Sequence, residues 1–316
     1  GEDMKNYTIY LFVIIALLFN NAIADDKITL LLDWFINPDH GPVIIANEKG
    51  IFKEEGLEVQ IIPPANPSDP PKLVAAGKAD IAISYQPQLH MQVHEGLPVI
   101  RIGTLVATPL NCLLVLKDGP IKQLSDLKNK KIGYSIAGME QALLSAILKK
   151  ANINKDEVEY INVNWSLSPA LMSKQVDAVI GAYRNFELNQ MEIEGVEGKC
   201  FYIEEEGVPP YDELIFIVNN QNINKKMLIK FLSAIEKATQ YIINHPEESW
   251  KIFANSSKEL NNELNRKAWF DTIPRFALRP AALDKGRYNR FEEFLYVEGL
   301  INKKLSYDKM AIEIFE

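Results

Sequence analysis

The chain has 316 residues, of which 47% are hydrophobic and 24% charged, a composition typical of globular rather than disordered or fibrous proteins. Its formal net charge is −8 and no basic block offsets this charge, which argues against nucleic acid or an anionic membrane as a partner. Its two cysteines are too few for a disulfide framework.

The first segment has the pattern of an export signal. Residues 1–3 precede the first methionine and are interpreted as a remnant of expression. Residues 4–24 combine an early lysine, an apolar stretch over 7–19 and the small-x-small cleavage site Ala22-Ile23-Ala24, which predicts a cleavable signal peptide. No cysteine follows this site, so no lipoprotein anchor is expected. We therefore expect the mature chain to begin near Asp25 and to be a free protein outside the cytoplasm.

Short apolar segments alternate with helical patterns at the start of the mature chain. The expected order is strand 28–32, helix 42–49, strand 57–62, helix 70–76 and strand 80–84. Gly50 and Gly77 follow the two helices, as expected where a helix ends in the left-handed conformation. Such alternation predicts a mainly parallel sheet with right-handed crossovers.

The alternation restarts after a strand over 113–117. Strands are expected over 131–134, 158–163 and 178–181, with helices over 141–150 and 169–174. After a return strand over 214–218 the pattern becomes helical, over 225–244, 247–254, 258–270 and 287–297. We predict an α/β protein of two lobes crossed twice by the chain. Lobe 1 is assigned residues 25–113 and 217–316, and lobe 2 residues 114–216.

Polar side chains cluster in the loop after the first strand. Trp34 stands there beside Asp33, Asn37, Asp39 and His40, just before a helix. In open α/β sheets, ligands bind beyond the carboxyl ends of strands, where helix N-termini also point. An aromatic ring in this place indicates recognition of a flat polar molecule, and a structural core tryptophan is an equal alternative.

Two further strand ends carry candidate residues. Ser84 and Tyr85 follow the strand over 80–84, so Tyr85 is expected to face Trp34 across a cleft and to clamp a heteroaromatic ring; a tyrosine packed at a helix start is the alternative. Tyr134 and Ser135 lie in a small-residue turn over 133–138. Free backbone N–H groups of such a turn can grip a carbonyl or an anion, although turns of this kind are common.

The next candidates follow the strand over 178–181. A carboxylate such as Glu187 can accept hydrogen bonds from the ring N–H and the exocyclic amino group of an aminopyrimidine, and Asn185 is its polar neighbour. An isolated glutamate on a helix is more often a solvated surface residue. Tyr211 precedes the return strand and lies near the expected hinge.

Signatures of enzymes and metal sites are sparse. The chain has no G-x-S-x-G elbow, H-E-x-x-H motif, P-loop or zinc-type Cys/His cluster. His90 and His94 are four residues apart on an expected helix, but no third ligand is evident. We expect no metal and no cofactor.

The whole mature chain resembles the thiamine-pyrimidine branch of ABC-transporter substrate-binding proteins. The resemblance includes Leu31-Leu32-Asp33-Trp34, residues 50–57, Asn185-Phe186-Glu187 and Pro210-Tyr211-Asp212-Glu213. It implies a type II periplasmic-binding-protein fold with a ligand cleft between the lobes. It also implies a periplasmic monomer that captures a thiamine pyrimidine precursor, of the formylaminopyrimidine or hydroxymethylpyrimidine type, for an inner-membrane ABC permease and ATPase.

The resemblance also suggests how the ligand is held. Trp34 and Tyr85 would stack on the ring, and Asn185 and Glu187 would read its amino edge. The other expected contacts are Asn37, Ser84, Tyr134, Ser135 and Tyr211.

Related pyrimidine synthases consume one of their own histidines and need a cysteine-rich segment for iron chemistry. Gln88 stands at the position of that histidine, and residues 208–213 contain no cysteine. We therefore expect a binding protein rather than an enzyme. A binder of a sulfonate, nitrate or riboflavin-like ligand and, less favoured, a pyrimidine synthase are the alternatives. The sequence leaves open whether Cys112 and Cys200 form a disulfide.

Overall fold

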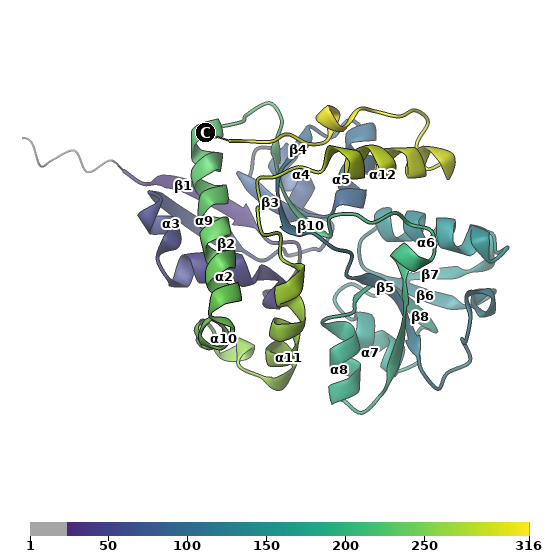
Figure 1. The fold of residues 1–316 in the computed structure, drawn as a ribbon. Helices are drawn as coiled ribbons and strands as arrows, with labels where there is room; N and C mark the ends of the chain where they lie inside the picture. The colour runs from purple at the N-terminus through teal and green to yellow at the C-terminus, as the bar shows by residue number, and fades with distance from the viewer. Residues whose placement is uncertain (1–23, 316) are drawn as a thin grey trace, which may run out of the picture.

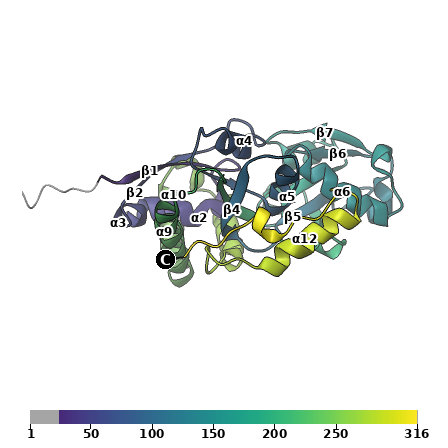
Figure 2. The same cartoon turned by 90° about the horizontal axis from the view of Figure 1, so that it is seen from above.

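The protein has two α/β lobes that lie side by side (Figures 1 and 2). The structure is a computed structural model that describes residues 24–315. The expected remnant and signal peptide therefore lie, up to residue 23, outside the described residues. Within the described part, no helix combines the length and the apolar character needed to cross a membrane.

The first lobe contains a five-stranded sheet of order β2-β1-β3-β10-β4. Strand β1 (Asp26–Leu31) pairs in parallel with β2 (Leu57–Ile62) and β3 (Ile81–Ser84). The return strand β10 (Leu214–Asn219) runs antiparallel between β3 and β4 (Val99–Val106). The helices of this lobe are α2 (Gly41–Glu48), α3 (Ile51–Glu54), α4 (Pro70–Ala75), α5 (Gln86–His94), α9 (Lys225–Asn244), α10 (Pro246–Asn255), α11 (Glu263–Thr272) and α12 (Lys285–Val297).

The second lobe repeats this plan with the order β7-β6-β8-β5-β9. Strand β6 (Lys131–Tyr134) pairs in parallel with β7 (Glu159–Asn162) and β8 (Ala178–Tyr183), and β5 (Asn111–Leu116) runs antiparallel between β8 and β9 (Gly198–Tyr202). Its helices are α6 (Met139–Lys150), α7 (Leu167–Met172) and α8 (Glu187–Ile193). The expected two-lobed α/β fold is confirmed, and each sheet is mixed because the crossing strand is antiparallel.

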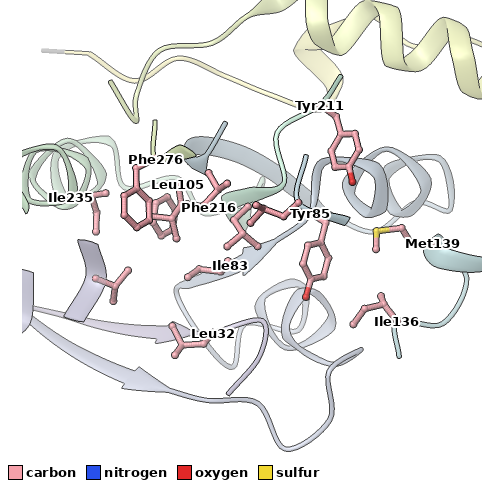
Figure 3. Close-up of a cluster of buried hydrophobic side chains, with 14 of the residues drawn as sticks. Leu32, Ile83, Tyr85, Leu105, Ile136, Met139, Tyr211, Phe216, Ile235 and Phe276 are labelled. Carbon is pink, nitrogen blue, oxygen red and sulfur yellow. The ribbon is translucent and has the colours of Figure 1, made fainter. Parts of the chain in front are cut away.

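The chain passes between the sheets twice, before β5 and before β10. Each of these strands lies whole in its new sheet, so the expected boundaries at 113/114 and 216/217 fall inside strands. We propose that the lobes divide at residues 107–110 and 203–213 instead. A continuous core supports both lobes, and Figure 3 shows Tyr85 of the first lobe beside Ile136 and Met139 of the second.

Several segments differ from the sequence-based expectation; strand β9 and the short helix α3, for example, were not expected. The single helix expected over 258–270 is divided into a 3-10 turn (Lys258–Leu260) and α11, because Asn262 accepts a hydrogen bond from Asn265 N and begins a new helix there. Strand β4 was not expected, since the charged Arg101 interrupts its apolar pattern. The structure buries Arg101 completely. Its Nη2 donates to Thr104 Oγ1 and to the carbonyl oxygen of Pro280, whereas its Nε has no hydrogen-bond partner among the described residues.

Cys112 on β5 and Cys200 on the neighbouring β9 form a disulfide, which the sequence left open. The bond closes a loop between residues 88 positions apart, and such cross-links stabilise chiefly by restricting the unfolded chain. We expect the Cys112→Ala/Cys200→Ala variant to lose about 2–4 kcal/mol of stability. Thermal melts with and without reductant test this, because reductant should affect only the parent protein. Equal melting temperatures for parent and variant would contradict it.

Candidate functional site

A pocket lies between the lobes, at the carboxyl ends of β1, β3, β6 and β8. This is the place where ligands bind in open α/β sheets. Five of the nine expected contact residues line the pocket, namely Trp34, Asn37, Tyr85, Ser135 and Glu187.

The other four expected residues lie outside the pocket lining. Ser84 donates a hydrogen bond to Gln88 Oε1 at 3.0 Å, and Tyr134 packs edge-on against Tyr160. Asn185 is buried and spans the lobes, because its Nδ2 donates to Asp39 Oδ1 at 2.6 Å and to Thr272 Oγ1 at 2.7 Å. Tyr211 is fully buried and donates to Glu213 Oε1 at 3.2 Å. Asn185 and Tyr211 therefore position acidic residues that line the pocket.

The loop after β1 is fixed by a buried hydrogen-bond network. Tyr85 donates its hydroxyl to Asp33 Oδ2, and His40 Nε2 bonds to Asp33 Oδ1, both at 2.8 Å. Asn37 N donates to His40 Nδ1, which leaves the proton on Nε2 to point at Asp33. Burial and the neighbouring Asp33 raise the pKa of Tyr85 well above its ordinary value, so its hydroxyl remains a neutral donor. The network holds the loop that carries Trp34 in one conformation.

Glu187 stands at the first position of α8 and faces the pocket. Its Oε2 accepts a hydrogen bond from Tyr183 N at 3.1 Å. Burial raises the pKa of Glu187 to about 8. Near neutral pH the group therefore holds a proton that it can share with a basic ring nitrogen.

Sequence reasoning missed two further acidic groups of the pocket. Glu213 Oε1 accepts from Leu110 N at 2.8 Å and Asn111 N at 2.6 Å, and burial raises the pKa of Glu213 to about 7. Glu140 Oε2 accepts from two amides of the turn after β6, and burial raises the pKa of Glu140 to about 8. Glu213 was part of a noted sequence run, whereas Glu140 resembled an ordinary acidic residue in the first turn of a helix.

Aromatic side chains of the two lobes meet beside the pocket. Trp34 and Trp165 lie edge to face with ring centroids 4.6 Å apart, and Phe35 approaches Phe186 at 5.8 Å. Trp34 also packs against core residues of both lobes. The structure therefore shows a closed arrangement in which Trp34 belongs to the contact between the lobes as well as to the pocket.

His90 and His94 both bond to the carboxylate of Glu292 on α12. They connect α5 to α12 and lie outside the pocket lining. Among residues 24–315, no group of three or more His, Cys, Asp or Glu side chains is arranged to hold a metal ion. The pair thus has a structural partner that the sequence did not reveal.

The buried acids make the stability of the ligand-free protein depend on pH. Glu140 and Glu187 have folded-state pKa values of about 8 against an ordinary 4.5, so the folded chain binds more protons than the unfolded chain between these values. Stability must then fall as pH rises through this window. We expect the melting temperature to fall from acidic to mildly alkaline buffer, and the fall to be shallower in Glu140→Gln. Superimposable pH profiles for the two proteins would refute this.

The chain matches one protein family and is similar to three proteins with names related to thiamine or its pyrimidine. The family profile described as NMT1/THI5 like matches residues 37–249. A Haemophilus influenzae protein named for thiamine biosynthesis is 49% identical over 96% of this chain and 97% of its own. The formylaminopyrimidine-binding protein of Halalkalibacterium halodurans is 30% identical over 83% and 82%. A 4-amino-5-hydroxymethyl-2-methylpyrimidine phosphate synthase of Saccharomyces cerevisiae is 28% identical over 78% and 76%.

Solved structures with the same fold include periplasmic binding proteins. The alkanesulfonate-binding protein of Xanthomonas axonopodis superimposes with a TM-score of 0.72 over 92% of this chain and 100% of that chain. The identity is 12%, so the likeness concerns the fold alone.

Proposed function

The chain belongs to the NMT1/THI5-like family, and on this basis we propose that it is the periplasmic substrate-binding protein of an ABC importer for thiamine pyrimidine precursors. Its ligand would be of the formylaminopyrimidine or hydroxymethylpyrimidine type, taken up for salvage. The name of the Halalkalibacterium halodurans relative supports this ligand class. The fold, shared with periplasmic binding proteins, supports the binding role.

The pairing of aromatic rings with buried acids in one pocket carries the proposal. Trp34 and Tyr85 supply flat apolar surface, and Glu187 supplies a carboxyl group that matches an aminopyrimidine edge. A protonated carboxyl donates to the ring nitrogen and accepts from the amino group; if the proton moves to the ring, the same two hydrogen bonds remain. The pocket is therefore suited to a flat molecule rich in donors.

Residue identities favour binding over synthesis. Gln88, at the position of the histidine that synthases consume, accepts a hydrogen bond from Ser84. The crossing segment over 208–213 lacks cysteine, and both cysteines of the chain are paired elsewhere. Because the yeast relatives are named as synthases, enzyme activity is the second candidate. It predicts an iron-dependent loss of a histidine side chain, which intact-mass analysis before and after incubation would reveal.

The exported, periplasmic location is part of the proposal. The signal-like N-terminal sequence supports it, and so does the disulfide, because such bonds persist in oxidising compartments. We further propose that the protein acts as a monomer that docks on an inner-membrane permease driven by its ATPase.

Native mass spectrometry of the freshly purified protein tests the ligand class without a prior choice of compound. We expect a fraction of the protein to carry a bound molecule with the mass of an aminopyrimidine, released on denaturation. A sulfonate, nitrate or flavin-like molecule in its place would assign the protein to another ligand class.

A further inference from the structure

We propose that Glu140 is a specificity-determining residue that makes the pocket reject anionic ligands. Its carboxyl group fills the anion-binding cradle at the start of α6, so the pocket takes an uncharged or cationic ring and excludes the phosphate ester of that ring. This inference rests on the proposed function for the identity of the ring, but the cradle itself can be tested without it.

The cradle is formed by the turn between β6 and α6. A turn that opens a helix of this length presents free backbone N–H groups and the positive end of the helix dipole, a common site for phosphate. Here Ser135 N and Ile136 N both donate to Glu140 Oε2, at 2.8 and 3.1 Å. Gly138 N donates to Gln141 Oε1 at 3.1 Å. The sequence led us to expect free amides in this turn, and the chain's own side chains occupy them.

Glu140 is held in this place from the opposite side by β8. Gly181, which also lines the pocket, adopts a φ of +96°, and a Cβ there would lie 2.1 Å from Glu140 Oε1. The carboxyl group therefore lies directly against the backbone of Gly181, and the residue Glu140 as a whole is only 2% exposed. A phosphate cannot share the cradle unless this side chain leaves it.

The rest of the pocket offers an anion no compensating charge. The ionisable lining residues are tyrosines and acids, and none of the described lining residues is a lysine or arginine. Arg184, from the loop beside Glu187, is engaged by Glu204 Oε2 and by the carbonyl oxygens of Leu110 and Asn111. Near neutral pH Glu140 excludes an anion by occupying the amides, and above its pKa of about 8 its charge adds repulsion.

Calorimetry on two ligands tests the proposal, with hydroxymethylpyrimidine and its phosphate ester as the pair. We expect the parent protein to bind the alcohol at least about 100-fold more tightly than the ester. Glu140→Ala frees the amides and should reduce that ratio by about tenfold or more. Glu140→Gln keeps an oxygen on both amides and should retain the discrimination at neutral pH. Equal affinities in the parent protein, or equal ratios for Glu140→Ala and the parent, would overturn the proposal.

Thermal melts with inorganic phosphate test the role of Glu140 independently of the proposed pyrimidine ligand. If the parent protein binds neither pyrimidine, the ligand assignment fails, while thermal melts in millimolar phosphate still test the cradle. We expect phosphate to stabilise Glu140→Ala and not the parent or Glu140→Gln. If Glu140→Ala does not fold, Glu140→Ser serves for both measurements. If phosphate does not raise the melting temperature of folded Glu140→Ala or Glu140→Ser, the proposed role of Glu140 is refuted.

Discussion

Replacement of Glu187 by glutamine is expected to weaken binding of the pyrimidine ligand by about 100-fold or more. Glutamine keeps the size of the side chain and can still place an N–H and a C=O group against the aminopyrimidine edge, but it cannot transfer its proton to the ring nitrogen. The charge-assisted pair between a carboxylate and a protonated ring is therefore lost. Loss of one partner from a buried, charge-assisted pair costs about 2–5 kcal/mol, and each 1.4 kcal/mol is about tenfold in affinity. Titration calorimetry of the parent and Glu187→Gln measures the difference.

Glu192 on the same helix provides the matched control. Its side chain is 62% exposed and pairs with Lys267, away from the pocket lining. Glu192→Gln should therefore leave affinity within about twofold of the parent, since exposed ion pairs contribute little. If Glu187→Gln behaves like Glu192→Gln, the carboxyl group of Glu187 does not read the ligand.

Replacement of Trp34 by alanine should produce the second largest loss, about 30-fold or more in affinity. Central tryptophans of binding sites commonly contribute 2 kcal/mol or more, about 30-fold. Here Trp34 lines the pocket and also contacts Trp165 across the cleft, so its removal weakens both ligand contact and lobe closure. The measurement is the dissociation constant by calorimetry or by quenching of the remaining tryptophans.

Trp34→Phe distinguishes a stacking role from a purely structural one. Phenylalanine keeps a flat ring in the loop and should recover most of the lost affinity. A Trp34→Ala protein that binds as tightly as the parent would show that this tryptophan serves the core alone, the alternative that the sequence held equal.

Elements with regular apolar periodicity could be predicted from sequence, whereas strands β4 and β9, in which a charged residue interrupts the apolar pattern, could not. The strands over 57–62 and 131–134 and the amphipathic helix over 225–244 have the expected bounds, since each lies between clear turn or cap residues. Strand β4 was missed because its buried Arg101 donates to the carbonyl oxygens of Pro280 and Ala282, which lie far along the chain. Such compensation appears only once the fold brings distant segments together.

Some residues of the pocket could likewise be predicted from sequence and others could not. Trp34, Tyr85 and Glu187 were found because polar and aromatic residues at strand ends form ligand sites in α/β folds. The carboxyl groups of Glu140 and Glu213 accept hydrogen bonds from backbone amides. The amides that bind Glu213 belong to the first segment that crosses between the lobes, whereas Glu213 lies on the second. No local sequence pattern predicts these carboxyl–amide hydrogen bonds, because an acidic residue in the first turn of a helix is common in sequences.

The buried acidic residues lower the stability of the ligand-free protein, but they can accept hydrogen bonds from a ligand that has donor groups. Burial holds Glu140, Glu187 and Glu213 partly protonated near neutral pH. A ligand with an amino group and a basic ring nitrogen satisfies the carboxyl group of Glu187 and shares its proton. Binding should therefore stabilise the protein most below the pKa of Glu187, about 8, and less in mildly alkaline buffer.

Calorimetric titration with formylaminopyrimidine, hydroxymethylpyrimidine and thiamine is the most direct test of the proposed function. We expect at least one of the three to bind with a measurable heat that Glu187→Gln greatly reduces. Absence of binding for all three compounds to the folded, ligand-stripped protein would contradict the pyrimidine assignment.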